Sequence, residues 1–506
     1  MDQRKCDVLV IGGGGAGMIA GVRAAEVCGG DVVILEKAGY IGGGMLFAST
    51  MRTFRSRWQK ERNIPDQTTK FIRQMMDLTM WKLDPKTVSN AILGTGEFFD
   101  WYSEMETPEN LAKYEPRPYV FDIPVGGQVG PQVDGFHKGS GEMFMKAMRK
   151  KADELGVTVL TKAAAKDVVV DNGKITAVIA DVNGEEVRIG CKICVIASGS
   201  WIQNKEIVEK VLPEFLEADV FPNAHQNPAY TGDAIAFAEK AGAYVDWESF
   251  CLRIMGPMCA LGETSKFDSL THAQEQVLVN LNAQRFVAEP MAPRIDPFDT
   301  GHILLQQPKA KSFFLFSKNT IDAMHERTKA FGESPDQDPF GMDPIPPHEE
   351  VRGWFLEAQE KRPKDFAAAD TVEELAGKLG LNPQALVGTV SQYDASCAAG
   401  EDLLLCKEEA FLVPLGDGPY YGMTGYLSTD GAFGGVRVNP DCQVYAADGE
   451  HLVDGLYAAG DIASGRHIVM NRVKKQVLND MSWAVSSGFR AGTQAGEAAK
   501  KLQDYA

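Results

Sequence analysis

A glycine-rich turn close to the start of the chain constrains its fold more than any other feature. An apolar run at residues 6–11 leads into the sequence Gly12-Gly13-Gly14-Gly15-Ala16-Gly17, and residues 18–27 then have the character of a helix. A second apolar run at residues 31–35 ends at Glu36. The order of strand, G-x-G-x-x-G turn, helix, strand and acid is typical of a dinucleotide-binding βαβ unit.

Each residue type in this unit has a physical task. Gly12 allows the tight turn, Gly14 lets a pyrophosphate approach the backbone, and Gly17 lets the helix pack closely on the strand. The free N–H groups at the start of the helix favour the charge of the phosphates. Glu36 can accept hydrogen bonds from ribose hydroxyls, and because its charge disfavours a 2′-phosphate, NADP is not expected at this site.

The segment that follows indicates which dinucleotide binds. It reads Glu36-Lys37-Ala38-Gly39-Tyr40-Ile41-Gly42-Gly43-Gly44-Met45, and a second glycine-rich loop at this point suits a bulky ligand. It resembles the E-K-x(4)-G-G pattern of the flavoprotein subunit family of fumarate reductases and succinate dehydrogenases, which includes soluble ene-reductases and 3-ketosteroid dehydrogenases. The resemblance implies FAD. Respiratory members bind the flavin covalently through a His after the double glycine. Residues 46–50 contain no His, so we expect non-covalent FAD.

The resemblance continues in family order along most of the chain. Counterparts exist of a G-x-I-x-G-V hairpin, a V-I-L-A-T-G-G strand and turn, and the elements T-G-D-G, V-N-x-x-G-x-R-F-V-N-E, G-L-Y-A-A-G-E and H-G-A-N-R. They lie at residues 173–178, 194–200, 231–233, 279–289, 455–461 and 471–472. We therefore expect the cofactor-binding residues to be Gly12, Gly14, Gly15, Ala16, Gly17, Glu36, Lys37, Gly43, Gly44, Met45, Ala164, Ser198, Gly199, Asp233, Asp461, Gln476 and Val477.

The expected fold class is α/β, with a discontinuous Rossmann-like FAD-binding domain and an inserted α+β capping domain. The FAD-binding domain would comprise residues 1–250, with a helical excursion at about 55–115, and residues 415–506. The capping domain would comprise residues 251–414, with short helices at 372–379 and 383–399. Since ligands usually bind at domain interfaces, we expect the site between the two domains.

Five residues are candidates for the chemistry, in which flavin passes hydride to an activated alkene and an acid protonates the neighbouring carbon. The resemblance implies a proton-donating Arg at Arg294, although this residue lies one position further past Glu289 than the family pattern has, and a surface arginine in a Pro-rich loop is the alternative. Arg472 matches the substrate-binding Arg of the family, and His467 lies near its His. A salt-bridging Arg and a helix-end His are the alternatives. A Tyr acid, as in ketosteroid dehydrogenases, could be Tyr421 or Tyr426.

Three departures from the family pattern weaken fumarate as the substrate. The positions of the fumarate proton relay fall on Ser269 and His272, and the element at 428–435 lacks the expected His. Lys474 and Lys475 replace glycines of the flavin-contacting L-G-G-N-A element, and they either approach the flavin or point to solvent. A cleft without the dicarboxylate relay could take an aromatic or steroid-like enone.

Composition excludes several other classes. The chain has 506 residues with 51 Lys+Arg against 69 Asp+Glu, a net charge of −18, which argues against binding to a nucleic-acid backbone. No run of about 18 apolar residues is present, so we expect no membrane span. The nine cysteines have irregular spacing, which favours a reducing, cytoplasmic location, and we read Cys191 and Cys194 as structural thiols. The scattered histidines give no metal-binding pattern, so no metal is expected.

The sequence thus favours an FAD-dependent oxidoreductase acting on an activated C–C bond of a small unsaturated substrate. A 3-ketosteroid or aromatic enone reductase or dehydrogenase, an electron-transfer subunit with a vestigial substrate site, and a flavin-dependent oxidase remain as alternatives. A second G-x-G-x-x-G motif for NAD(P)H is absent from the sequence. Electrons are therefore expected from a partner protein or from free reduced flavin.

Overall fold

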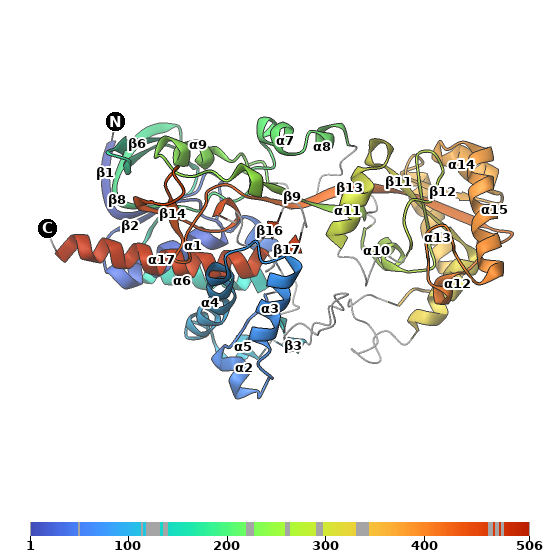
Figure 1. Ribbon diagram of the computed structural model, residues 1–506, viewed down its shortest axis with the longest axis horizontal. Coiled ribbons are helices and arrows are strands. Elements are labelled where there is room, and N and C mark those ends of the chain that lie inside the picture. The colour runs from blue at the N-terminus through green and yellow to red at the C-terminus, as the bar shows by residue number, and fades with distance from the viewer. Residues whose placement is uncertain are drawn as a thin grey trace.

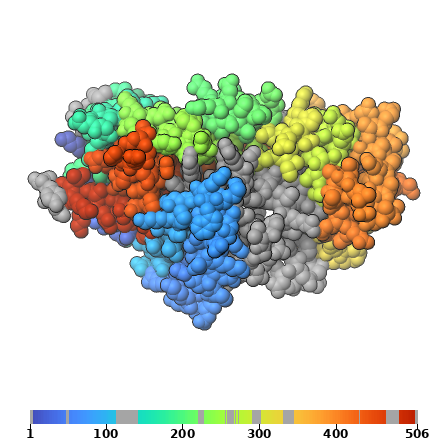
Figure 2. Space-filling model, viewed as in Figure 1, coloured from blue at the N-terminus to red at the C-terminus, as the bar shows by residue number. Residues whose placement is uncertain are grey.

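A computed structural model of the chain describes most of its residues. The described ranges are 2–48, 51–112, 115–117, 132–134, 140–218, 227–258, 264–289, 297–329, 344–463, 469–470, 475–476 and 480–504. Two lobes lie at opposite ends of the long axis, and β9 and β13 run between them (Figure 1). The space-filling view shows the lobe built from chain segments 264–289, 297–329 and 344–416, yellow to orange, apart from the N- and C-terminal segments (Figure 2).

The first lobe is built on a largely parallel sheet in the order β14-β15-β8-β1-β2-β5, extended by the antiparallel strands β6 and β7. Residues 173–178 lie in the hairpin that joins β6 to β7, as the sequence predicts. The strands are β1 Asp2–Ile11, β2 Val32–Leu35, β5 Thr158–Leu160, β6 Ala163–Asp171, β7 Lys174–Val182, β8 Glu185–Ile196, β14 Gln443–Tyr445 and β15 Leu452–Ala458.

Helices cover both faces of this sheet. One hydrophobic core joins the sheet to α1, α4, α6 and α17, and a second core, on the other face, includes residues of α3, α7 and α9. The excursion predicted at about 55–115 is helical and consists of α2 to α5. The bounds are α1 Gly15–Cys28, α2 Arg57–Glu61, α3 Thr68–Leu78, α4 Pro85–Ser103, α5 Pro108–Leu111, α6 Ser140–Glu154, α7 Lys205–Val211, α8 Glu214–Glu217, α9 Asp233–Lys240 and α17 Asp480–Asp504.

The second lobe contains an antiparallel sheet with helices on both faces. Its core against α12 and α13 is separate from its core against α14 and α15. The first residues of β13 pair with β11 and β12, and its later residues pair with β9. The elements are β9 Cys251–Met258, α10 Thr264–His272, β10 Val277–Asn280, α11 Pro297–Leu305, β11 Ser312–Ser317, α12 Lys318–Thr328, α13 His348–Lys361, β12 Phe366–Ala369, α14 Val372–Leu379, α15 Pro383–Ala399 and β13 Tyr420–Phe433.

The predicted α/β fold class with a parallel sheet core is confirmed, and local elements differ from the predictions mainly at their ends. The first strand begins at Asp2 rather than residue 6, because residues 2–5 also pair with the long strand β8. The first helix begins at Gly15 rather than residue 18, since the last residues of the glycine turn already form its first turn. The boundaries proposed for the two domains stay predictions.

Two short ribbons complete the described structure, β3 Glu115–Arg117 with β4 Gln132–Asp134 and β16 Val469–Met470 with β17 Lys475–Gln476. Cys191 and Cys194 both lie on β8 as free thiols. Among the described helices, none combines the length and the apolar character needed to cross a membrane.

Candidate cofactor site

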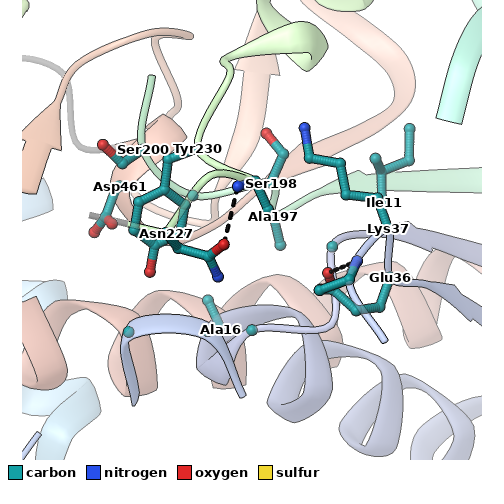
Figure 3. Close-up of a pocket in the computed structure, with 18 of the residues that line it drawn as sticks. Ile11, Ala16, Glu36, Lys37, Ala197, Ser198, Ser200, Asn227, Tyr230 and Asp461 are labelled. Atoms are coloured by element: carbon teal, nitrogen blue, oxygen red, sulfur yellow. Dashed lines mark hydrogen bonds between the residues drawn. The ribbon is translucent and has the colours of Figure 1, made fainter. Parts of the chain in front are cut away.

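A cavity of about 360 Å³ lies at the carboxyl ends of the parallel strands β1, β2 and β8, which is where open α/β sheets bind ligands. Figure 3 shows Glu36 and Lys37 at one end of it and Asp461 and Tyr230 at the other. Its lining includes the predicted residues Gly12, Gly14, Gly15, Ala16, Glu36, Lys37, Gly43, Gly44, Met45, Ser198, Gly199, Asp233 and Asp461.

The glycine turn is tight where it packs on the protein and open where it faces the cavity. A Cβ atom built on Gly12, whose φ is +111°, would lie 2.3 Å from the Ala197 carbonyl oxygen, and one built on Gly17 would lie 1.9 Å from the Gly12 oxygen. By contrast, the nearest atom to a Cβ built on Gly14 is the Gly42 oxygen at 4.0 Å. The turn therefore leaves room for a ligand next to the backbone at Gly14.

Helix α1 presents its N-terminus to this space. Gly14 is its N-cap residue and provides no side chain to cap the first N–H groups, and no acidic residue lies in the first turn. Uncapped N–H groups and the positive end of the helix dipole attract an anion. The part of the cavity next to this N-terminus suits a diphosphate.

Glu36, directly after β2, is held in place by the backbone. Its Oε2 accepts a hydrogen bond from the Gly13 N–H at 2.8 Å, and its Oε1 accepts one from the Ala38 N–H at 2.7 Å. Each carboxylate oxygen has a further acceptor position, since an ionised carboxylate offers about four. Glu36 can therefore also accept a hydrogen bond from a ribose hydroxyl.

Lys37 ties the first βαβ unit to the segment before α9. Its Nζ forms an ion pair with Asp233 Oδ2 at 2.8 Å and a hydrogen bond with the Thr231 hydroxyl, which itself donates to Asp233 at 2.6 Å. Burial raises the pKa of Asp233, but the hydrogen bonds from Lys37 and Thr231 outweigh it and hold that pKa below its ordinary value. Asp233 is therefore ionised at neutral pH.

The end of the cavity opposite Glu36 and Lys37 contains side chains that the motifs did not indicate. Asn227 and Tyr230 line it next to Asp461 (Figure 3). Tyr230 directly precedes the T-G-D element, so its place in the chain was the available signal. Ser198 Oγ, buried at the cavity, has no hydrogen-bond partner among the described residues. A buried polar atom without a partner is costly, and a ligand that bonds to it would remove that cost.

Several predicted residues do not line the cavity. Gly17 lies behind the turn, against Gly12. Ala163 and Ala165 on β6 line the cavity. Ala164 lies between them in the chain and therefore faces the opposite side of the strand. Gln476 is placed on β17 by its backbone alone. Val477, Arg294, His467 and Arg472 lie outside the described residues.

Tyr426 lies on β13, apart from the residues that line the cavity. Its hydroxyl donates to Asp365 Oδ1 at 2.5 Å. Tyr421, the other candidate tyrosine, is buried in the core of the second lobe, with its oxygen 2.8 Å from His348 Nε2. Burial raises the pKa of Tyr421 to about 12.

The residues present fit FAD. The cavity has a helix N-terminus for a diphosphate, an acid at the end of β2 for a ribose, and a buried serine oxygen without a partner. Over the described part of the chain, no group of three or more His, Cys, Asp and Glu side chains could hold a metal ion.

Comparison with known proteins identifies the class. Residues 7–473 match the family described as FAD binding domain. The chain therefore belongs to the FAD binding domain family, and FAD is its cofactor.

Three relatives show what the chain is similar to. Probable fumarate reductase Ifc3 of Shewanella frigidimarina is 26% identical over 476 residues, which cover 91% of this chain and 70% of that protein. A vinyl phenol reductase of Lactiplantibacillus plantarum is 24% identical over 483 residues, covering 91% and 90%. An NADH:fumarate oxidoreductase of Klebsiella pneumoniae is 24% identical over 506 residues, but this chain covers only 48% of its length.

Solved structures share the fold. The open conformation of a flavocytochrome c3 fumarate reductase superposes with a TM-score of 0.72 at 22% identity, covering 98% of this chain and 79% of that one. A 3-ketosteroid delta1-dehydrogenase from Sterolibacterium denitrificans superposes with a TM-score of 0.72 at 16% identity, covering 98% and 100%. At these identities the similarity shows a common fold.

Proposed function

We propose that the protein is an FAD-dependent oxidoreductase that reduces or forms an activated C=C bond of a small unsaturated substrate. Fumarate, vinyl phenol and ketosteroids, named in the proteins compared above, have in common a C–C bond, reduced or formed as an alkene, next to a carbonyl, a carboxylate or an aromatic ring. When bound, FAD supplies hydride transfer for such a reaction. We further propose that the FAD is held without a covalent bond, because residues 46–50 offer no His.

One observation carries the proposal most directly. The cofactor cavity extends to Gly431 on β13, and the same strand continues to Tyr420 in the sheet of the second lobe. A cofactor that fills this cavity would therefore reach the strand that runs between the two lobes, where a substrate can be enclosed away from water.

We propose Arg472 and Arg294 as the residues that bind the substrate and deliver the proton, and His467 as a further residue that takes part in the chemistry. A guanidinium stays charged and can form two parallel hydrogen bonds with a carboxylate or polarise a carbonyl. Tyr426 is the alternative donor, and the hydrogen bond from its hydroxyl to Asp365 orients it. The residues Ser269 and His272 at the relay positions disfavour fumarate, so we favour a carbonyl-conjugated or aromatic alkene. The electron donor would be a partner protein or free reduced flavin.

An anaerobic screen tests this function. The reduced protein is mixed with unsaturated acids, enones and aromatic alkenes, and reoxidation of the flavin is followed. The proposal expects rapid reoxidation by at least one alkene, with the saturated product recovered. Reoxidation by one-electron acceptors alone would instead favour an electron-transfer subunit, and rapid oxygen consumption with a reduced substrate would favour an oxidase.

The Arg472→Ala variant tests the site within this function. We expect it to keep its bound flavin and to lose alkene turnover, because the substrate would no longer be held and polarised. Flavin content and the rate of reoxidation by the alkene are measured on the same preparation, with Arg437→Ala as a control, since Arg437 packs between Tyr244 and Tyr445 instead. Normal turnover by Arg472→Ala would show that the assignment is wrong.

A further inference from the structure

Tyr230 lies in the FAD cavity on a segment with a fixed backbone. Its N–H donates to the Asn227 carbonyl at 3.0 Å, and its own carbonyl accepts from the Gln203 N–H at 2.9 Å. Three residues further on, Asp233 is tied to Lys37 by the ion pair described above. The position of the Tyr230 ring is therefore set by its surroundings rather than by a loose loop.

The ring crosses the cavity between two glycine-rich loops. A Cβ atom built on Gly44 would lie 3.0 Å from the Tyr230 hydroxyl oxygen, and one built on Gly199 would lie 3.7 Å from its Cε1. A Cβ built on Gly43 would lie 3.7 Å from the same oxygen and 3.6 Å from Gly14 Cα. The hydroxyl therefore lies close to the start of α1, toward which the ring points in Figure 3.

Because of the charges that line the cavity, a diphosphate bound there would accept hydrogen bonds mainly from neutral donors. Among the described lining residues the charged side chains are Glu36, Lys37, Asp233 and Asp461, and the lysine is engaged with Asp233. The favourable partners that remain for phosphate oxygens are N–H groups at the start of α1 and hydroxyls. Burial, and next the charge of Asp461, raise the pKa of Tyr230 well above its ordinary value, so the phenol keeps its proton.

We propose that Tyr230 is a cofactor-binding residue whose hydroxyl accepts from the Gly44 N–H and donates to the diphosphate of FAD at the start of α1. The ring then closes the cavity over the middle of the cofactor. This role concerns FAD alone and does not depend on which alkene is reduced.

Ligands that share parts of FAD test the contact. Purified wild-type protein and the Tyr230→Phe and Tyr230→Ala variants are freed of flavin, and the affinities for FAD, ADP and adenosine are measured by titration. ADP carries the diphosphate and adenosine does not. Losing one hydrogen bond to a charged group weakens binding by about tenfold or more. We expect Tyr230→Phe to lose this factor for FAD and for ADP alike, with adenosine unchanged, and Tyr230→Ala to lose more for FAD.

Two controls keep the result interpretable. Tyr244→Phe removes a phenol that does not line the cavity, and it should bind all three ligands as the wild type does. The thermal midpoint of each flavin-free variant reports folding, and Tyr230→Phe keeps the ring that fills the space. Unchanged FAD and ADP affinities in Tyr230→Phe would overturn the proposal. An equal loss for adenosine would also overturn it, because the hydroxyl would then act on the shape of the segment and not on the diphosphate.

Discussion

At the scale of single residues, two helical glycines differ in what surrounds them. A Cβ built on Gly17 in α1 would lie 1.9 Å from the Gly12 carbonyl oxygen, whereas nothing lies within 4 Å of a Cβ built on Gly353 in α13. Backbone atoms cannot move aside as a flexible side chain can. The first glycine is therefore required by packing, and the second is not.

This contrast gives a paired prediction. Gly17→Ala should lower the free energy of unfolding by about 1–3 kcal/mol through overpacking and should reduce FAD retention, since the glycine turn must shift. Gly353→Ala should raise the free energy of unfolding by about 0.5–1 kcal/mol, because alanine favours a helix more than glycine does. Denaturant unfolding and flavin content measure both effects. Equal stability of the two variants would contradict the packing at Gly17.

A second set of residues forms a buried charge cluster in the second lobe. Arg285 pairs with Glu289 at 2.7 Å and with Asp402 at 2.9 Å, and Lys407 Nζ donates to the Gln276 carbonyl at 2.8 Å. The lysine side chain is fully buried, 3.8 Å from Glu289. Burial lowers the pKa of Lys407 from 10.5 to about 8, although the Glu289 charge acts in the opposite direction.

This shift predicts a pH dependence of stability. Between pH 8 and 10.5 the unfolded chain still holds the Lys407 proton that the folded protein has released. The unfolded state then binds more protons, so the contribution of Lys407 to the free energy of unfolding rises with pH across this window. In Lys407→Met this rise should disappear, whereas Lys266→Met, which removes an exposed ion pair with Glu357, should keep it. Parallel pH profiles of wild type and Lys407→Met would disprove the assignment.

At the scale of elements, the contact between α1 and α17 positions the part of the cavity that suits a diphosphate, next to the N-terminus of α1. Gly488, Gly492 and Gly496 are spaced four residues apart on α17, and a Cβ on each would lie 2.6, 2.4 and 2.9 Å from the carbonyl oxygens of Ala16, Ala20 and Ala24 respectively. The two helices can approach this closely only because the stripe has no side chains. The same contact holds the N-terminus of α1 in place.

A change in this stripe should affect both stability and cofactor. Gly492→Ala forces the helices apart and should cost about 1–3 kcal/mol of unfolding free energy, with faster release of FAD because the start of α1 moves. Gly377→Ala in α14, where nothing lies within 4 Å, serves as the matched control and should be neutral or stabilising. A Gly492→Ala variant with wild-type stability and FAD release would refute the role given to this contact.

Elements with strong local signals could be predicted to the residue. Asn382 caps α15 by accepting from the Ala385 N–H, Pro383 occupies its first turn, and Gly400 ends it in the left-handed region, as the sequence indicates. β13 could not be predicted, because its polar and glycine-containing run becomes a strand only through partners distant in the chain. The glycine stripe of α17 was missed for the same reason, since its spacing has meaning only against α1.

The candidate site likewise contains residues that could be predicted from the sequence and residues that could not. The glycine turn, Glu36 and the second glycine loop follow from motifs with a known physical task, and the structure places them on one cavity. Tyr230 and Asn227 reach that cavity through tertiary folding, and the only local signal for either is the place of Tyr230 directly before the T-G-D element. Ala164 illustrates a smaller error, because a motif identifies a strand more readily than the face of the strand that a given residue occupies.

At the scale of the whole molecule, the paired strands β13 and β9 run between the two lobes (Figure 1). The parallel sheet provides the cofactor cavity, and the antiparallel sheet with the helices that flank it forms the second lobe. In the proposed reaction, the first lobe holds the cofactor and the second encloses the substrate. The whole account depends on FAD occupying the cavity.

The flavin content of the purified protein tests this claim most directly. The visible absorption spectrum is recorded, the protein is then denatured and precipitated, and the supernatant is assayed for FAD. The account predicts a yellow protein that releases about one FAD per chain into the supernatant, as expected for one cofactor site held by non-covalent contacts. A colourless protein that stays colourless after incubation with FAD would contradict it.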